Sequence, residues 1–173
     1  NPIIRPTINC IAATYELTGP LTRATSHLSG KEINRFTHIH QSIEDLVTKS
    51  KMCRMLGMYT GSCFQRCVGM DALNTLSIVT HDIDKKHGTE YNKRFLKFLR
   101  YVQDEDLVCD GAMTDAKGDR SLRPAEMSDL DQYIHVVEEK SDGIVVRGAK
   151  LHQTGAVNSH EIICMPTRAM RQE

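Results

Sequence analysis

Residues 109–124 read CDGAMTDAKGDRSLRP, and this stretch divides the chain into two parts of different character. It is rich in Gly, Asp, Thr and Pro, the residues that favour loops and turns. Before it, apolar residues recur at helical spacing, and after it β-branched runs alternate with turn residues. The sequence therefore predicts an α+β fold, with an N-terminal helical domain at residues 1–107 and the beginning of an antiparallel β domain at residues 108–173.

Two long helices are predicted before residue 90. The first occupies residues 42–57, because Ser42 and Asp45 form a capping-box pattern ahead of regularly spaced apolar residues. The second occupies residues 62–87 and stops at Gly88, a residue type that commonly ends helices. Its apolar positions, which we expect to be buried, are Phe64, Val68, Leu73, Leu76, Val79 and Ile83.

A third helix and several strands complete the prediction. Thr89 is expected to cap the third helix, which ends in the acidic residues 104–106. Strands are expected within YIHVVEE (133–139), IVVRGAKLHQTGA (144–156) and HEIICMP (160–166), since turn residues separate these β-branched runs.

Composition and charge exclude several classes of function. The 22 Lys and Arg residues balance the 22 Asp and Glu residues, and no basic stripe suggests a nucleic-acid partner. No apolar run reaches the roughly 18 residues of a membrane span. The six cysteines are thinly spread, which favours a reducing compartment, the cytoplasm. The chain begins at Asn1 rather than Met and ends after a strand-like run, so we expect a fragment that lacks a C-terminal helical domain.

The cysteine pair in GSCFQRC, residues 61–67, is the most informative short motif. On a helix, Cys63 and Cys67 would share one face with β-carbons about 5–6 Å apart, too far for a disulfide but suited to one metal centre. Arg66 is expected to lower the thiol pKa, and Gly69 leaves room for a bulky group. The alternative is that both cysteines pack in the core, as free cysteines often do. Spacing alone leaves the two interpretations open.

The loop MTDAKGDR, residues 113–120, carries groups that suit a flavin cofactor. An isoalloxazine ring and a pyrophosphate need hydroxyl and backbone donors, a cation, and backbone that can approach closely. Thr114, Lys117, Gly118 and Arg120 supply these in one loop. A solvated turn between helix and sheet is the alternative interpretation.

Four motifs, in the same order, resemble the 4-hydroxybutyryl-CoA dehydratase branch of the 4-hydroxyphenylacetate 3-hydroxylase flavoproteins: SCFQRCVGMDA, DGAMTDAKGDRS, DGIVVRGAK and HQTGAVNSHE. The resemblance extends from about Pro2 to Thr167 and implies an acyl-CoA dehydrogenase-like fold. It implies dehydration of 4-hydroxybutyryl-CoA to crotonyl-CoA by a flavin radical mechanism, with an iron–sulfur cluster as Lewis acid, and a vinylacetyl-CoA isomerase activity. It also implies a homotetramer that binds an acyl-CoA, while charge balance and the lack of a long apolar run argue against a nucleic-acid or membrane partner.

The resemblance assigns roles to particular residues. Cys63 and Cys67 match two ligands of a [4Fe–4S] cluster, while the remaining ligands and the catalytic base are expected outside this chain. Arg54 and Gln65 are expected to contact the substrate. The residues expected to bind FAD form two segments: Met113, Thr114, Asp115, Lys117, Gly118 and Arg120, and then His152, Gln153 and Thr154, with Thr154 near the redox-active edge of the ring.

Two further hypotheses remain open at this point. A flavin-dependent aromatic hydroxylase of the same fold would use Cys63 and Cys67 for packing only. A non-enzymatic helical module would bind zinc at the same pair. Cofactor analysis would separate the three hypotheses. Iron with sulfide would indicate the dehydratase, flavin alone the hydroxylase, and zinc alone the module.

Overall fold

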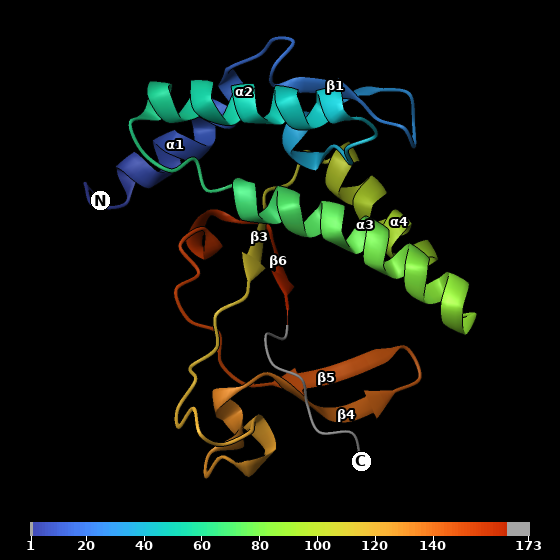
Figure 1. Ribbon diagram of the computed structural model, residues 1–173. Coiled ribbons are helices and arrows are strands. Elements are labelled where there is room, and N and C mark those ends of the chain that lie inside the picture. The colour runs from blue at the N-terminus through green and yellow to red at the C-terminus, as the bar shows by residue number, and fades with distance from the viewer. Residues whose placement is uncertain (1, 166–173) are drawn as a thin grey trace. The chain divides into compact units, whose positions relative to one another are not determined.

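The computed structural model describes residues 2–165 (Figure 1). The chain forms two compact units. Unit 1 comprises Asn1–Asp110 and Gly155–Ile162, and unit 2 comprises Gly111–Thr154 and the chain from Ile163 onward. The predicted domain boundary at residues 107 and 108 stays a prediction, and residues 166–173 of the predicted β domain lie outside the described residues.

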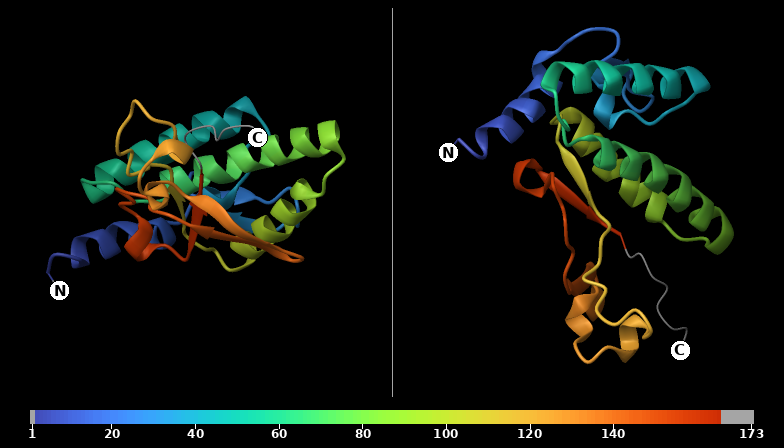
Figure 2. Two further views of the ribbon diagram at one scale, coloured as in Figure 1. Left: turned by 90° about the horizontal axis from the view of Figure 1, so that it is seen from below. Right: turned by 60° about the vertical axis from the view of Figure 1, so that its left-hand side comes forward.

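Unit 1 is built mainly from helices, as predicted. The described residues contain α1 (Arg5–Glu16), α2 (Ile43–Thr60), α3 (Cys67–His87) and α4 (Tyr91–Asp104). Strands β1 (Arg23–Thr25) and β2 (Glu32–Asn34) pair antiparallel between α1 and α2 in the sequence. Helices α3 and α4 pack against each other and lie side by side in both views of Figure 2. No helix among the described residues is both long and apolar enough to cross a bilayer.

The capping box predicted for α2 is confirmed. The backbone N–H of Asp45 donates to Ser42 Oγ at 3.2 Å, and the N–H of Ser42 donates to Asp45 Oδ2 at 3.1 Å. These two bonds satisfy backbone donors that have no partner inside the helix. The predicted end at residue 57 is wrong, since the helix continues to Thr60. Gly61 caps it with a φ of 62°, the left-handed conformation that glycine adopts without strain.

The predicted start of α3 is wrong. This helix begins at Cys67 rather than at residue 62, because Gln65 adopts a left-handed backbone conformation with φ of 59°. A non-glycine residue in that region interrupts a right-handed helix. The predicted end is confirmed, since Gly88 caps the helix with φ of 67°.

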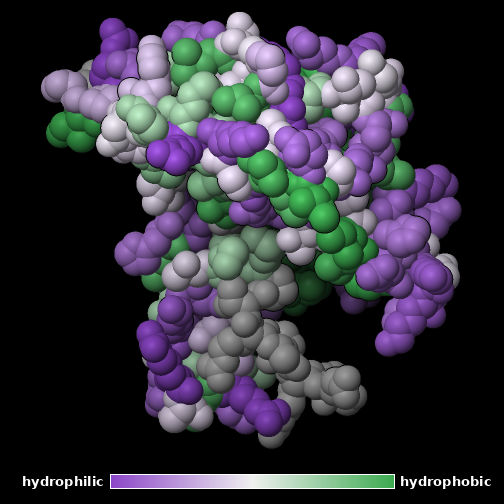
Figure 3. Space-filling model, turned by 45° about the horizontal axis from the view of Figure 1, so that its top comes forward, coloured by the Kyte–Doolittle hydropathy of each residue, from purple (hydrophilic) through white to green (hydrophobic). Residues whose placement is uncertain are grey.

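The apolar stripe predicted along α3 is buried only at its beginning. Phe64, which precedes the helix, and Leu73 are buried, whereas Val68, Val79 and Ile83 are exposed. The hydrophobic periodicity is correct for a helix, but it does not show which partner covers the stripe. Figure 3 shows a band of hydrophobic surface that follows α3.

The cap predicted for α4 comes from a different residue. Thr89 does not cap the helix; its hydroxyl donates to Asp84 Oδ1 at 2.5 Å. The carboxylate of Asp84, near the end of α3, accepts from the backbone N–H groups of Tyr91 and Asn92 at 2.9 and 2.8 Å. Asp84 therefore satisfies the first donors of α4 and ties the two helices together.

A compact apolar cluster forms part of the core of unit 1. Full burial of a side chain of this kind stabilises the fold by about 1.5–3 kcal/mol. Two half-buried cysteines, Cys53 and Cys67, pack against its surface. The cluster consists of Phe36, Met52, Leu56, Phe64 and Met70.

Unit 2 contains the predicted antiparallel hairpin. Strands β4 (His135–Lys140) and β5 (Gly143–Arg147) pair antiparallel, and Lys140 lies opposite Gly143 at the turn. A β-bulge shifts the register between Val136 and Glu138.

Strands β3 (Cys109–Ala112) and β6 (Glu161–Cys164) form a separate pair. Val108 O accepts from the N–H of Glu161 at 3.2 Å, and Ala112 O accepts from the N–H of Met165 at 3.0 Å. Both strands therefore run in the same direction, as Figure 1 shows, and the prediction of antiparallel pairing is wrong for this pair. Parallel pairing needs a long connection, which the residues between β3 and β6 provide.

Candidate functional site

The two candidate metal ligands lie at the connection between α2 and α3. Cys63 is exposed in this loop, and Cys67 is the half-buried first residue of α3. Burial raises the pKa of the Cys67 thiol, and the neighbouring Cys63 raises it further by its charge and a side-chain hydrogen bond. The backbone N–H groups of Cys67 and Val68 act in the opposite direction. The two sulfur atoms are therefore neighbours, although Cys63 does not share a helix face with Cys67 as predicted.

No disulfide joins the candidate ligands. All six cysteines of the chain are free, which confirms the prediction that Cys63 and Cys67 are not bonded to each other. The exposure of Cys63 is also informative, because a cysteine that serves only for packing is expected to be buried. The core-packing interpretation therefore fits Cys67, which touches the apolar cluster, better than it fits Cys63.

Arg66 does not act on the thiols as predicted. Its side chain is 1% exposed and donates to Thr14 Oγ1, Asp106 Oδ1 and Leu107 O, each at 3.1 Å. These contacts direct its charge away from the two thiols, and burial raises the pKa of Cys67 instead of the predicted lowering. The position of Arg66 between the two cysteines gives it a structural role, since it fixes the loop from inside.

The space beside Gly69, predicted to admit a bulky group, is occupied by the backbone of Cys109. A β-carbon at this position would lie 1.9 Å from the backbone oxygen of Cys109, far inside van der Waals contact. Gly69 thus allows β3, rather than a cofactor, to approach the first turn of α3.

A complete metal site is not present among the described residues. Burial is the main cause of the raised pKa of Cys53, and the charge of the nearby Cys67 raises it further. No group of three or more His, Cys, Asp or Glu side chains in residues 2–165 is arranged to hold one metal ion. The role predicted for Cys63 and Cys67, two ligands of a centre whose other ligands come from elsewhere, therefore stays a prediction.

A cavity of about 340 Å³ opens beside Cys63. Its wall is formed by α1 and by residues 59–65, and it contains Gln65, one of the two predicted substrate contacts. Arg54, the other one, is an exposed residue of α2 and is not part of this wall. The remaining polar groups of the cavity include Thr7, Asn9, Tyr59, Thr60 and Ser62.

The two segments predicted to bind FAD lie side by side in unit 2. The N–H of Leu151 donates to Thr114 O at 2.8 Å, and Asp115 and Lys150 form an antiparallel bridge. Lys150 Nζ lies 2.6 Å from Asp115 Oδ1, and both side chains are nearly buried, 6% and 3% exposed. The carboxylate of Asp115 is thus held by Lys150, a residue that sequence reasoning missed. A separation of 35 residues leaves no pattern that could have revealed the pair.

The remaining residues of these segments present groups that a flavin nucleotide could use. Lys117 and His152 have positive φ angles of 72° and 57°, which turn the backbone sharply at both places. Tyr133 Oη donates to Lys117 O at 3.1 Å and steadies this turn. The exposed members of the predicted set are Met113, Lys117, Gly118, Arg120, His152 and Thr154, while Thr114 and Gln153 are half-buried. Exposed donors and a cation on two adjacent segments fit the predicted role.

A hollow of unit 2 lies apart from these segments. It has a volume of about 780 Å³ and an apolar wall formed by the β4–β5 hairpin and the turns before it. None of the predicted flavin residues belongs to its wall. Size alone therefore does not identify the cofactor site.

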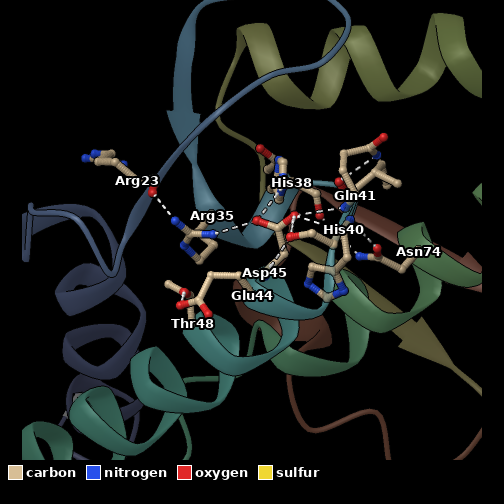
Figure 4. Close-up of polar contacts among 12 residues, drawn as sticks. Arg23, Arg35, His38, His40, Gln41, Glu44, Asp45, Thr48 and Asn74 are labelled. Atoms are coloured by element: carbon tan, nitrogen blue, oxygen red, sulfur yellow. Dashed lines mark hydrogen bonds and ion pairs between the residues drawn. The ribbon is translucent and has the colours of Figure 1, made fainter.

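A polar cluster surrounds Asp45 at the start of α2 (Figure 4). Asp45 accepts from the N–H of Gln41 at 2.9 Å and lies 3.3 Å from His38 Nε2 and 3.5 Å from Arg35 Nη1. Burial raises the pKa of Asp45, but the hydrogen bonds from Gln41 and Ser42 and the neighbouring His38 ring outweigh burial and lower it. His38 is buried, and neither of its ring nitrogens has a well-directed hydrogen bond within residues 2–165. Burial lowers the pKa of His38. This cluster, which sequence reasoning missed, anchors α2.

Comparison with known proteins identifies the family. The N-terminal profile of the 4-hydroxyphenylacetate 3-hydroxylases matches residues 1–173. The chain belongs to this family. It is 55% identical to the 4-hydroxybutyryl-CoA dehydratase/vinylacetyl-CoA-Δ-isomerase of Clostridium aminobutyricum, over 99% of this chain and 36% of that protein. The resemblance inferred from the four motifs is thereby confirmed.

Solved structures of 4-hydroxyphenylacetate 3-hydroxylase family members agree with this result. An oxygen-tolerant archaeal 4-hydroxybutyryl-CoA dehydratase from N. maritimus superposes with a TM-score of 0.95 and 53% identity, over 99% of this chain and 35% of that one. The chain thus spans about a third of these relatives, 36% and 35% of their lengths.

Hydroxylases of the family are more distant. The oxygenase component of 4-hydroxyphenylacetate 3-monooxygenase from Thermus thermophilus is 25% identical over 99% of this chain and 35% of that protein. A crystal structure of such an oxygenase component complexed with FAD has a TM-score of 0.65 and 24% identity, over 87% of this chain and 32% of that one. At this identity the likeness shows a shared fold.

Proposed function

We propose that the whole protein dehydrates 4-hydroxybutyryl-CoA to crotonyl-CoA and isomerises vinylacetyl-CoA. The observation that carries the proposal is the 55% identity to a dehydratase/isomerase over 99% of the chain, against 25% to a hydroxylase component. The exposed thiol of Cys63 beside Cys67 agrees with it, because the dehydratase hypothesis gives that pair a chemical role. The acyl-CoA dehydrogenase-like fold assignment is part of the same proposal.

Cys63 and Cys67 would hold one side of a [4Fe–4S] cluster. Thiolates are the usual ligands of such clusters. The backbone N–H groups at the first turn of α3 stabilise the thiolate of Cys67, and Arg66 fixes the loop between the two residues. A bound cluster would supply a Lewis acid for the departing hydroxyl group.

The segments 113–120 and 152–154 would hold FAD, which would supply one-electron redox chemistry. Lys150 and Asp115 fasten the two segments to each other from the interior. Lys117 and Arg120 offer positive charge at the surface, and Thr114, Gln153 and Thr154 offer hydroxyl and amide groups. The chain's own contribution at this site is to bind and orient the cofactor.

Gln65 and Arg54 would contact the substrate. Gln65 offers its side-chain amide at the cavity beside Cys63 and can orient an oxygen of the substrate there. Arg54 is exposed and can meet a negative charge of the coenzyme A portion. The catalytic base is expected in the part of the protein beyond this chain.

Assembly and compartment belong to the proposal as well. We expect a homotetramer, which the exposed apolar side chains of α3 support, since such surfaces often mark contacts with other protein (Figure 3). We expect the cytoplasm, which the free state of all six cysteines supports.

Turnover by the full-length protein tests the proposal. Anaerobically purified enzyme should convert 4-hydroxybutyryl-CoA to crotonyl-CoA, followed by the absorbance of the enoyl thioester. The same preparation should not hydroxylate 4-hydroxyphenylacetate when it is given reduced flavin and oxygen. Hydroxylation without dehydration would reject the dehydratase in favour of the aromatic hydroxylase, and absence of both activities with bound zinc would favour the non-enzymatic module.

A further inference from the structure

A chain of hydrogen bonds in unit 1 begins at α1. Thr7 Oγ1 donates to Ile4 O at 2.8 Å. A hydroxyl group has a single proton, so Thr7 Oγ1 can only accept from the Asn158 side chain, which lies 3.2 Å away. The atom of Asn158 that faces Thr7 must therefore be its amide nitrogen. The two hydrogen bonds of Thr7 therefore fix the orientation of the Asn158 side-chain amide.

The same nitrogen reaches Gln65. Asn158 Nδ2 lies 3.0 Å from Gln65 Oε1 and carries a second proton for this contact. The atom of Gln65 that faces Asn158 is therefore the carbonyl oxygen, and Nε2 occupies the other end of the amide. No described residue accepts a hydrogen bond from Gln65 Nε2, and Gln65 belongs to the wall of the cavity that contains Cys63.

The backbone holds both residues in place. Asn158 ends the short 3₁₀ turn Ala156–Asn158, and Gln65 is buried in a left-handed conformation. A β-carbon on Gly155 would lie 3.2 Å from Gln65 O, so the turn and the cysteine loop are in close contact. Fixed backbone on both sides leaves the amide orientation as the remaining variable.

We propose that Asn158 is a positioning residue: it fixes Gln65 so that an N–H donor, rather than a carbonyl, faces the cavity beside Cys63. The cavity then favours a ligand that presents an oxygen acceptor there, either the 4-hydroxyl group or the thioester carbonyl of the acyl-CoA. The inference rests on the proposed function, because it concerns the same substrate. It gives Asn158 a role at the substrate site, whereas the sequence analysis assigned only Arg54 and Gln65 to the substrate.

Binding to the full-length holoenzyme tests the proposal and separates the two oxygens. Calorimetry compares 4-hydroxybutyryl-CoA with butyryl-CoA, which keeps the carbonyl and lacks the hydroxyl. A site built to donate to an oxygen discriminates against an analogue without it. If Gln65 donates to the hydroxyl, wild type prefers the hydroxylated ester, and Gln65→Ala and Asn158→Ala each reduce the preference by about tenfold. If it donates to the carbonyl, both variants weaken both esters equally.

Combined variants show whether Asn158 acts through Gln65. The double variant should bind as weakly as either single one, because both changes remove the same oriented donor. Asn158→Asp should be worse than Asn158→Ala, since a carboxylate makes Gln65 turn its oxygen toward the cavity, and Gln65→Ala should abolish this difference. Asn92→Ala, which removes a hydrogen-bonded asparagine of α4, is the matched control and should bind like wild type.

Failure of this inference is distinguishable from failure of the proposed function. Losses that multiply in the double variant, or equal binding by Asn158→Asp and Asn158→Ala, overturn the role of Asn158 even if the wild-type enzyme dehydrates its substrate. Absence of dehydration by wild type overturns the proposed function. Calorimetry still decides the orientation in that case, because binding needs no turnover, and a wild type that binds neither ester also overturns the inference.

Discussion

Replacing Arg66 by Met should loosen the loop that carries both candidate cluster ligands. The guanidinium makes three hydrogen bonds of 3.1 Å and lies 4.8 and 5.1 Å from the ring centres of Tyr15 and Phe36. Met fills the space of the aliphatic stem but replaces none of the polar contacts.

The magnitude follows from what the change leaves behind. Removing one partner of a buried ion pair costs about 3–5 kcal/mol. Asp106 is 32% exposed and keeps the Asn34 amide at 3.2 Å, so that solvent and Asn34 compensate part of the loss. We therefore expect the lower end, about 3 kcal/mol, which corresponds to roughly a hundredfold change in an equilibrium constant.

Hydrogen exchange in the full-length protein measures this local effect. Amides of residues 61–70 should exchange about a hundredfold faster in Arg66→Met than in wild type, because they exchange through local opening. Arg100→Met, which replaces an exposed arginine of α4, is the control and should leave the loop unchanged. Unchanged protection of the loop in Arg66→Met would refute the reasoning that the buried guanidinium holds it.

Three further predictions concern packing, the flavin segments and pH. Gly69→Ala should destabilise the protein by about 1–3 kcal/mol, since its new β-carbon overlaps Cys109 O, and an unchanged midpoint of thermal unfolding would contradict this. Asp115→Ala should lower the FAD content of the purified full-length protein, because it breaks the buried pair with Lys150, whereas Glu139→Ala on the exposed β4 should not; equal FAD in both variants would count against the assignment. Burial lowers the pKa of His38 below 6.5, so the neutral ring is favoured in the folded state. The neutral His38 ring contributes fully to the free energy of unfolding above pH 6.5. This contribution is lost as the pH falls through the lowered folded-state pKa, because His38 of the unfolded chain takes up a proton at a higher pH than His38 of the folded chain. His38→Gln should therefore show a smaller loss of thermal stability below pH 6.5 than wild type, and an identical pH profile would contradict the argument.

Local signals allowed the sequence to predict much of the fold. The start of α2 and the end of α3 were predictable because a capping box and a glycine act through neighbouring residues. The hairpin of β4 and β5 was predictable for the same reason, since a turn separates two β-branched runs. The family was recognisable from the sequence because four motifs occur together and in the same order.

Contacts between distant residues could not be predicted in this way. The left-handed Gln65 moves the start of α3, and the Asp84 carboxylate replaces Thr89 as the cap of α4. At the candidate sites, Arg66 turns into the interior, and Lys150 and Asn158 reach partners far away in the chain. The contacts of Arg66, Lys150 and Asn158 depend on tertiary packing, which residue spacing does not encode.

Iron and acid-labile sulfide analysis of the anaerobically purified full-length protein tests most directly whether Cys63 and Cys67 ligate a cluster. Wild type and Cys164→Ser, which replaces another exposed cysteine, should each contain about four iron and four sulfide atoms per subunit. Cys63→Ser and Cys67→Ser should lose most of both while they keep their FAD. Full iron content in both of these variants, or a wild type that contains flavin or zinc without iron, would contradict the account.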